Sequence, residues 1–215
     1  MKKYLVIGNP IDHTFSPKLH NYWIKKNNIN AVYEKRKINE DDLKNIIFDI
    51  KKERLNGINV IVPFKKFIIP FLDELSAEAD ESQSVNTIHL QNGKILGHNT
   101  DISGFELAIK YSKYDVKNKI VFILGAGGVV SSIILALKKM GASKIIISNR
   151  TKTKAEDLKK LFNELEIIDW GETPIFDMVI NATSIGLKNE DGIKLNYSSV
   201  KHNKFFYDVI YNPEE

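Results

Sequence analysis

The chain has 215 residues, of which 43% are hydrophobic and 27% charged, and this mixture is typical of a folded globular protein. It has no cysteine, which excludes a disulfide framework, a thiolate nucleophile and cysteine-ligated metal centres, and which fits a reducing compartment. The net charge is +4, but the lysines are interleaved with acidic residues along the chain, so we expect no nucleic-acid partner.

The sequence predicts neither a targeting segment nor a membrane span. The apolar run 4–7 near the amino terminus stops at Gly8 and is too short for the core of a signal peptide. No stretch approaches the roughly 18 to 20 apolar residues that cross a bilayer. We therefore expect a cytoplasmic protein that does not interact with membranes.

Short apolar runs alternate with amphipathic stretches over the first hundred residues, and this alternation is typical of an α/β fold. The apolar runs predict strands at 4–7, 31–36, 58–62, 85–90 and 94–96. The amphipathic stretches predict helices at 17–26, 40–53 and, interrupted by Pro70, 64–84.

The same alternation continues in the second half with longer and more apolar runs. The expected strands are 120–124, 144–148, 178–181 and 205–210, and the expected helices are 101–111, 129–140 and 153–165. The segment 112–118 is polar and predicts a linker. We therefore place a domain boundary within residues 100–118.

A glycine turn at 125–128, with the sequence Gly-Ala-Gly-Gly, lies between the strand 120–124 and the helix 129–140. A dinucleotide pyrophosphate needs backbone amides that approach it closely and the positive end of a helix, and a turn in this place offers both. Glycine turns also occur for packing alone, but the surrounding strand–helix–strand unit favours a dinucleotide site.

The turn 149–154 after the next strand is rich in basic and hydroxyl side chains and contains no acid. An acid in this place binds the ribose hydroxyls of NAD, whereas a basic cluster receives the extra phosphate of NADP. Arg150 can bind a phosphate through two parallel hydrogen bonds, Thr151 can donate its hydroxyl and Lys154 adds a positive charge. A solvated basic turn with a helix cap is the alternative, and the neighbouring glycine turn favours NADP.

Polar residues also follow the expected strands of the first half. The loop 8–17 carries hydroxyls at Thr14 and Ser16, which could hold a substrate carboxylate, and Lys65 stands just beyond the strand 58–62. Ligands of α/β sheets bind at such strand ends. Read singly, the loop 8–17 fits turn and capping chemistry equally well, and the pairs Asn86-Thr87 and Thr100-Asp101 are turn and cap signals. A lone lysine in so lysine-rich a chain is usually an exposed charge.

Together these segments resemble the shikimate dehydrogenase family. The resemblance runs from Leu5 to Pro213 through GNPIDHTFSP, GINVIVPFK, SVNT, GHNTD, GAGG, NRTKTK, NATSIG and YDVIYNP, in the family's order and spacing. It implies NADP-dependent interconversion of 3-dehydroshikimate and shikimate, a step of aromatic amino acid biosynthesis. It also implies an α/β substrate-binding domain at 1–100, a connecting helix and linker at 101–118 and a Rossmann-type NADP-binding domain at 119–215.

The resemblance assigns roles to residues that match the family's motifs. Lys65 and Asp101 match the catalytic pair, in which the lysine supplies a proton and the aspartate orients it. The residues implied to bind the substrate are Thr14, Ser16, Lys65, Asn86, Asp101 and Tyr211. Those implied to bind the cofactor are Gly125, Ala126, Gly127, Gly128, Val129, Asn149, Arg150, Thr151, Lys154 and Val209, and no metal is expected.

Two departures from the family pattern bear on function. Ile61 stands where the family has a threonine whose hydroxyl reaches the substrate, and the family continues beyond the segment that ends here at Glu215. The alternatives are therefore a quinate or shikimate dehydrogenase that prefers NAD, and a shikimate-binding relative without catalysis. The expected partners are a small-molecule substrate and, at most, a second copy of the chain, as a monomer or homodimer.

Overall fold

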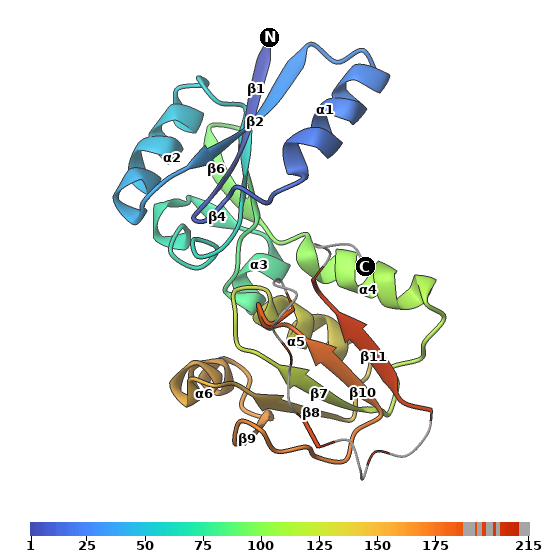
Figure 1. Ribbon diagram of the computed structural model, residues 1–215. Helices are drawn as coiled ribbons and strands as arrows, with labels where there is room; N and C mark the ends of the chain where they lie inside the picture. Colours follow the sequence, from blue (N-terminus) through green and yellow to red (C-terminus); the bar gives the residue numbers. More distant parts are fainter. Residues whose placement is uncertain (187–191, 193–194, 197–199, 201–202, 211–215) are drawn as a thin grey trace. The chain divides into compact units, whose positions relative to one another are not determined.

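The computed structural model describes residues 1–186, 192, 195–196, 200 and 203–210. The chain divides into two compact units, Met1–Thr100 and Asp101–Glu215, and each is built on one β-sheet with helices packed against it (Figure 1). The predicted α/β class is therefore confirmed. Among the described residues, no helix has both the length and the apolar character needed to cross a membrane.

The first unit contains a six-stranded sheet in the order β2-β1-β3-β5-β6-β4. Its strands are β1 (Lys2–Gly8), β2 (Ala31–Lys37), β3 (Gly57–Val60), β4 (Glu74–Leu75), β5 (Thr87–Gln91) and β6 (Lys94–His98). Its helices are α1 (Ser16–Lys26), α2 (Leu43–Lys51) and α3 (Ala77–Ser82), with short 3-10 turns at Glu40–Asp42 and Ile69–Phe71.

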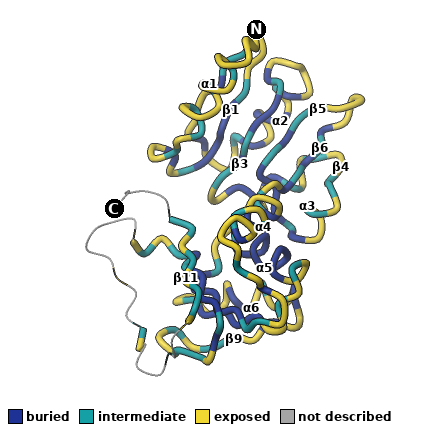
Figure 2. The backbone as a smooth tube through the Cα atoms, turned by 90° about the vertical axis from the view of Figure 1, so that its right-hand side faces the viewer, coloured by how far each residue is buried: buried dark blue, intermediate teal, exposed yellow. Residues whose placement is uncertain are grey.

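The side chains of β1 alternate between the two faces of this sheet, as the period of a strand requires. Leu5 and Ile7 join the larger apolar cluster with the buried side of α2. Val6 joins a smaller cluster that contains Tyr33 and Ile24 of α1. The two helices therefore cover opposite faces, and the central strands are the most deeply buried part of the unit (Figure 2).

Strand direction decides which loops meet at one edge of the first sheet. β1 runs parallel to β3, β5 runs antiparallel to β3, and β6 runs antiparallel to β5. The carboxyl ends of β1, β3 and β6 therefore lie at the same edge as the amino end of β5. The loops that carry most of the predicted substrate residues all leave the sheet at this edge.

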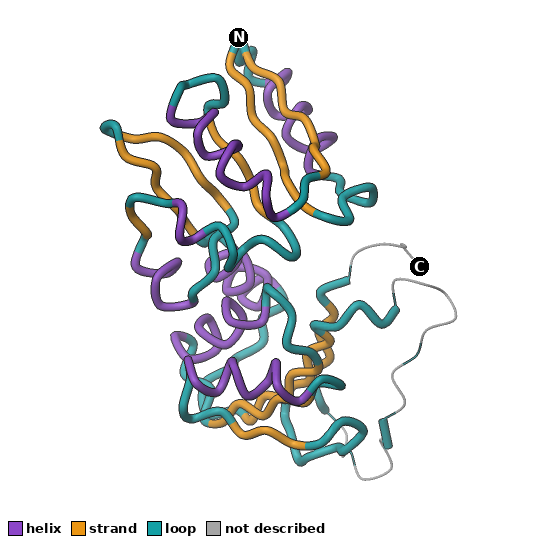
Figure 3. Tube along the Cα trace, turned by 90° about the vertical axis from the view of Figure 1, so that its left-hand side faces the viewer, coloured by secondary structure: helices purple, strands orange, loops and turns teal. Residues whose placement is uncertain are grey.

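The second unit contains a five-stranded sheet in the order β11-β10-β7-β8-β9, and every pair of neighbours is parallel. Its strands are β7 (Ile120–Leu124), β8 (Lys144–Ser148), β9 (Glu166–Ile168), β10 (Met178–Asn181) and β11 (Phe205–Asp208). Its helices are α4 (Asp101–Tyr111), α5 (Val130–Lys139) and α6 (Lys152–Leu161), which lie beside the strand layer (Figure 3).

The helix α4 is part of the core of the second unit. Its residues Ile102, Phe105 and Ile109 are buried in one apolar cluster with α5 and with the strands β7, β8 and β10. The segment 101–118, which the sequence suggests as a connecting helix and linker, thus supplies one of the packed layers of this unit.

Two expected helices are wrong in part, because tertiary pairing overrides local propensity. In the segment 64–84, the backbone N–H of Asp73 donates to the carbonyl of Ile95 at 3.0 Å, and the N–H of Ile95 donates to the carboxylate of Asp73 at 2.7 Å. These bonds draw the chain into β4, the outermost strand beside β6. Only α3 and one short 3-10 turn remain helical there. The helix expected at 153–165 ends at Leu161, because Glu166–Ile168 pairs with β8 as β9.

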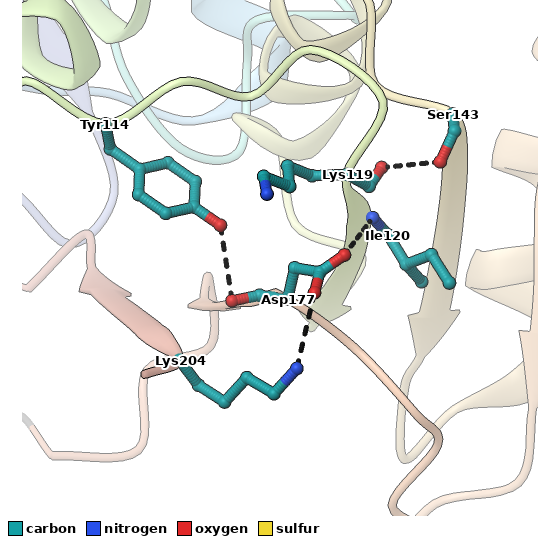
Figure 4. Close-up of polar contacts among 6 residues, drawn as sticks. All are labelled: Tyr114, Lys119, Ile120, Ser143, Asp177 and Lys204. Atoms are coloured by element: carbon teal, nitrogen blue, oxygen red, sulfur yellow. Dashed lines mark hydrogen bonds and ion pairs between the residues drawn. The ribbon is translucent and has the colours of Figure 1, made fainter. Parts of the chain in front are cut away.

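The carboxylate of Asp177 ties together the amino ends of β7, β10 and β11 (Figure 4). Its Oδ2 accepts the backbone N–H of Ile120 at 3.0 Å, and its Oδ1 accepts from the ammonium of Lys204 at 3.3 Å. The backbone carbonyl of Asp177 accepts the hydroxyl of Tyr114 at 3.3 Å. The hydrogen bond from Ile120, aided by Lys204, lowers the pKa of this carboxyl below its ordinary value, although burial opposes the shift.

We expect Asp177→Asn to lower the free energy of unfolding by about 1 kcal/mol at neutral pH, because it removes a charged hydrogen-bond acceptor that is still partly exposed. A carboxyl with a lowered pKa stabilises the fold above its unfolded-state pKa, and this contribution is lost as the pH falls through the folded-state pKa. Chemical denaturation at neutral and acidic pH measures this.

The difference in the free energy of unfolding between wild type and Asp177→Asn should therefore shrink as the solution becomes more acidic. The exposed Asp41→Asn is the control, and it should stay within about 0.5 kcal/mol of wild type at neutral pH. A gap that stays constant on acidification would show that the charge of Asp177 has no part in its effect.

Candidate functional site

The edge of the first sheet described above brings together the predicted substrate residues of the first unit. Thr14 and Ser16 lie in and just after the loop that follows β1, Lys65 follows β3, and Asn86 directly precedes β5. The backbone N–H of Asn9 donates to the carbonyl of Val62 at 3.1 Å and so joins the loops after β1 and β3.

The hydroxyls of Thr14 and Ser16 form a local pair. The Thr14 hydroxyl donates to Ser16 Oγ at 3.1 Å, and the backbone N–H of Ser16 donates to Thr14 Oγ1 at 3.3 Å. Lys35 supports this loop, because its ammonium donates to the backbone carbonyl of Asp12 at 3.0 Å. Each of the two hydroxyls carries one proton, so both can donate to a carboxylate only when the Thr14 proton rotates away from Ser16 Oγ.

Lys65 and Asn86 are joined through the backbone. The N–H of Val85 donates to the carbonyl of Lys65 at 2.9 Å, and the N–H of Asn86 donates to the carbonyl of His98 at 2.9 Å. Both side chains are polar yet only 9% exposed. Because a buried ammonium or amide is costly unless it is used in bonding, their placement at a loop-rich sheet edge is typical of a binding site.

Ile61 stands where the family has a threonine hydroxyl, and its side chain packs against apolar residues. It lies against the cluster of Val6, Ile11 and Tyr33. A Cβ atom added to Gly8 would lie 2.3 Å from Ile61 Cγ1, so the isoleucine occupies the space that the glycine leaves free. The side chain therefore contributes packing at the first loop and cannot donate a hydrogen bond.

The glycine turn of the second unit follows β7 at the point where the strand order reverses between β7 and β10, which is the place where open parallel sheets bind ligands. Gly125 has a φ of +110°, and a Cβ atom there would lie 2.7 Å from the carbonyl oxygen of Ala182. Only glycine fits this approach of two backbones. The turn leads through Ala126, Gly127, Gly128 and Val129 into α5, whose first residue is Val130.

The basic turn after β8 contains one paired and two unpaired cations among the contacts of the described residues. Lys152 forms an ion pair with Asp169 at 2.8 Å. Arg150 and Lys154 are exposed, and no ion pair of theirs occurs in the described part of the chain. Asn149 shapes the turn, because its amide donates to the carbonyl of Thr151 at 2.7 Å. Arg150 and Lys154 thus remain available for an anion.

The ends of β10 and β11 form a polar cluster to which the sequence assigns no role. The amide of Asn181 donates to Asp208 Oδ2 at 2.9 Å, and its Oδ1 accepts both the N–H and the hydroxyl of Thr183. Val209 follows directly, and its N–H donates to the carbonyl of Asn181 at 3.1 Å. Polar residues at the carboxyl ends of two apolar strands are the signal that points to such a cluster. Tyr211 lies outside the described residues.

The predicted residues thus fall into one group in each unit. Thr14, Ser16, Lys65 and Asn86 belong to the first group. The second group contains the residues at 125–129, Asn149, Arg150, Thr151, Lys154 and Val209. Asp101 is the first residue of α4 and of the second unit. Thr100 was not predicted as a site residue, yet its N–H and hydroxyl bond directly with the amide of Asn86.

Two family models match most of the chain. The model described as the shikimate dehydrogenase substrate binding domain matches residues 6–88, and the model described as shikimate / quinate 5-dehydrogenase matches residues 106–188. A curated shikimate dehydrogenase (NADP(+)) from Pelagibacter ubique is 63% identical over 214 residues, which cover 100% of this chain and 81% of the relative.

Solved structures agree in fold over nearly the whole chain. The crystal structure of shikimate dehydrogenase from Aquifex aeolicus is 40% identical with a TM-score of 0.89, and the match covers 98% of this chain and 79% of that one. A shikimate dehydrogenase solved in complex with NADP+ is 33% identical with a TM-score of 0.89, covering 100% of this chain and 78% of that one.

We expect Gly125→Ala to lower the free energy of unfolding by about 1 to 3 kcal/mol and to weaken dinucleotide binding, because it adds a clash to an unfavourable φ. Gly171→Ala is a matched control: Gly171 has a φ of +97°, but a Cβ atom there meets nothing within 4 Å. Thermal denaturation and NADP titration of both variants separate backbone strain from the clash. Equal losses in the two variants would contradict the role given to the approach of Ala182.

Proposed function

The chain belongs to the shikimate dehydrogenase family. We propose which of its residues bind and convert the substrate, and which bind NADP, in the interconversion of 3-dehydroshikimate and shikimate. The enzyme is an oxidoreductase of the shikimate pathway, which leads to the aromatic amino acids. We assign substrate binding to Met1–Thr100 and cofactor binding to the second unit. The observation that carries this division is the buried Lys65 at the same sheet edge as Thr14, Ser16 and Asn86.

Lys65 is assigned as the group that handles the proton. When a ketone receives a hydride, negative charge develops on its oxygen, and a cation that also donates a proton there lowers the barrier. The ammonium of Lys65 can do both, and its low exposure keeps it away from bulk water. Asp101 is assigned as the carboxylate that orients this ammonium and receives a ring hydroxyl, on the strength of its place in the motif GHNTD.

Thr14 and Ser16 are assigned to the substrate carboxylate and Asn86 to a ring hydroxyl. The Thr14 hydroxyl donates to Ser16 Oγ, so Ser16 is the donor that faces the carboxylate first, and Thr14 becomes a second donor when its hydroxyl proton rotates to the substrate. The Oδ1 of Asn86 accepts from Thr87 and Thr100, so the NH₂ of this amide is the group assigned to donate to the oxygen of a ring hydroxyl. Tyr211 keeps its expected place at the substrate on the basis of its motif.

The second unit fits a dinucleotide. Because Gly125 has no Cβ, the turn can pass close to the carbonyl of Ala182, and it leads into α5 in a form whose backbone amides can face a pyrophosphate. The amino end of α5 favours the negative charge of that group. NADP, when bound, supplies or accepts the hydride. The residues assigned to hold it are those at 125–129, Val209 and Asn149, together with Arg150, Thr151 and Lys154, which would contact the extra phosphate.

The relatives named as NADP(+) enzymes do not favour the NAD-preferring alternative. We further infer that the enzyme works in the cytoplasm as a monomer or as a homodimer, the latter being the commonest symmetric assembly. The composition without cysteine supports a reducing compartment. Light scattering on the purified protein would decide the oligomeric state.

We expect Lys65→Ala to lower kcat for shikimate oxidation about 10²- to 10⁴-fold, which is the usual contribution of a positioned acid or base. Reduction of NADP followed by absorbance measures the rate, and calorimetry measures shikimate binding. The control is Lys66→Ala, which removes the exposed neighbouring lysine and should leave the rate unchanged. Full activity of Lys65→Ala would contradict the assignment of the proton to Lys65.

We expect Arg150→Ala to raise the KM for NADP roughly 10- to 100-fold and to leave the KM for NAD nearly unchanged, because a charged hydrogen bond to the extra phosphate is lost. Lys152→Ala is the matched control, since Lys152 is already paired with Asp169. Steady-state rates with both cofactors give the ratio of the variant KM to the wild-type KM for NADP and for NAD. An equal loss with NADP and NAD would place Arg150 away from the extra phosphate.

A further inference from the structure

A chain of hydrogen bonds leads from the buried tyrosine of β2 to the amide of Asn86. The hydroxyl of Tyr33, which is 4% exposed, donates to Asn59 Oδ1 at 2.6 Å. Asn59 Nδ2 donates to Thr87 Oγ1 at 3.0 Å and to the backbone carbonyl of Asn86 at 3.2 Å. The hydroxyl of Thr87 then donates to Asn86 Oδ1 at 3.1 Å. We call these four residues the amide relay.

The direction of each bond in the amide relay is fixed by groups that have a single role. The backbone carbonyl of Asn86 can only accept, so the NH₂ of Asn59 must face it, and Asn59 Oδ1 then faces Tyr33. Burial raises the pKa of Tyr33 above its ordinary value, so its hydroxyl keeps the proton that it donates. Thr87 accepts from the NH₂ of Asn59, which leaves its one proton for Asn86 Oδ1.

The far end of the amide relay is held by Thr100. Its backbone N–H donates to Asn86 Oδ1 at 3.0 Å, and its hydroxyl oxygen lies 3.0 Å from Asn86 Nδ2. A reversed amide of Asn86 would place its NH₂ against the Thr100 N–H and the Thr87 hydroxyl, both of which are donors. The oxygen and the nitrogen of Asn86 therefore have one favourable arrangement.

We propose that Tyr33 and Thr87 are positioning residues for the substrate, and that both act on the amide of Asn86. Tyr33 acts through Asn59, whereas Thr87 bonds directly to Asn86 Oδ1. The inference rests on the role given to Asn86 under the proposed function. Tyr33 also stacks on the ring of His20 with centroids 4.2 Å apart, so the ring keeps its place when only the hydroxyl is removed. Because Asn86 holds the substrate before and during the reaction, loss of its orientation raises Kd and KM more than it lowers kcat.

The test compares Thr87→Val, which removes the hydroxyl, with Thr87→Ser, which keeps it. Shikimate Kd by calorimetry should rise about 5- to 10-fold in the valine variant, as expected for one lost hydrogen bond, and stay within about twofold of wild type in the serine variant. The kcat and the Kd for NADP should be unchanged in both. Tyr33→Phe should raise shikimate Kd in the same direction, and the double variant should show less than the product of the two effects.

Tyr114→Phe is the control for a lost tyrosine hydroxyl, because the partly buried Tyr114 bonds only to the backbone of Asp177 among the described hydrogen bonds of its side chain. It should lower thermal stability and leave shikimate Kd unchanged. Unchanged shikimate Kd in both Thr87→Val and Tyr33→Phe would overturn the proposal, as would an equal rise in Thr87→Ser and Thr87→Val. If Thr87→Val does not fold, an unchanged shikimate Kd in Tyr33→Phe would overturn the proposal, and so would a Kd in Thr87→Ser that rises as much as the Kd in Tyr33→Phe. Wild-type protein that binds no shikimate would instead contradict the proposed function.

Discussion

The direction of the strands in the first sheet is the constraint on which the proposed substrate site depends. Parallel β1 and β3 release their loops at one edge, and the reversal at β5 returns the chain to that same edge. Only for this reason do residues far apart in the chain lie at the same end of the sheet, as Thr14, Lys65 and Asn86 do. With β5 parallel to β3, Asn86 would lie at the opposite end of the sheet.

The turn after β7 in the second unit depends on backbone geometry. The close approach of Gly125 to the carbonyl of Ala182 fixes the turn between β7 and α5, and no other residue type fits there. The position that carries the third glycine in the usual dinucleotide pattern is Val130, which is fully buried in the core. Its side chain fills the space between helix and sheet, so the turn keeps its form without that glycine.

The sequence predicted those elements best whose apolar runs decide their place without help from distant residues. The strands at 120–124, 144–148 and 178–181 are confirmed at their predicted ends, because each is a continuous apolar run buried on both faces. The segment 64–84 was misjudged because the bond between Asp73 and Ile95 is invisible in a local pattern. The site residues could be named from motifs, but their assignments remain predictions. The amide relay could not be foreseen, since Tyr33 meets Asn59 only through strand pairing across the sheet.

Ile61 stands where the family has a threonine, so the proposed substrate site lacks one hydroxyl there. A substrate site built from hydroxyls and amides loses affinity one hydrogen bond at a time, and each loss costs on the order of 1 to 3 kcal/mol. Ile61 removes one donor, yet it packs against Gly8 and so supports the start of the loop that carries Thr14 and Ser16. The orientation of Asn86 by two independent donors does not depend on residue 61. The site can therefore lose the hydroxyl at this position and still hold the remaining donors in place, because their geometry is set by the sheet edge.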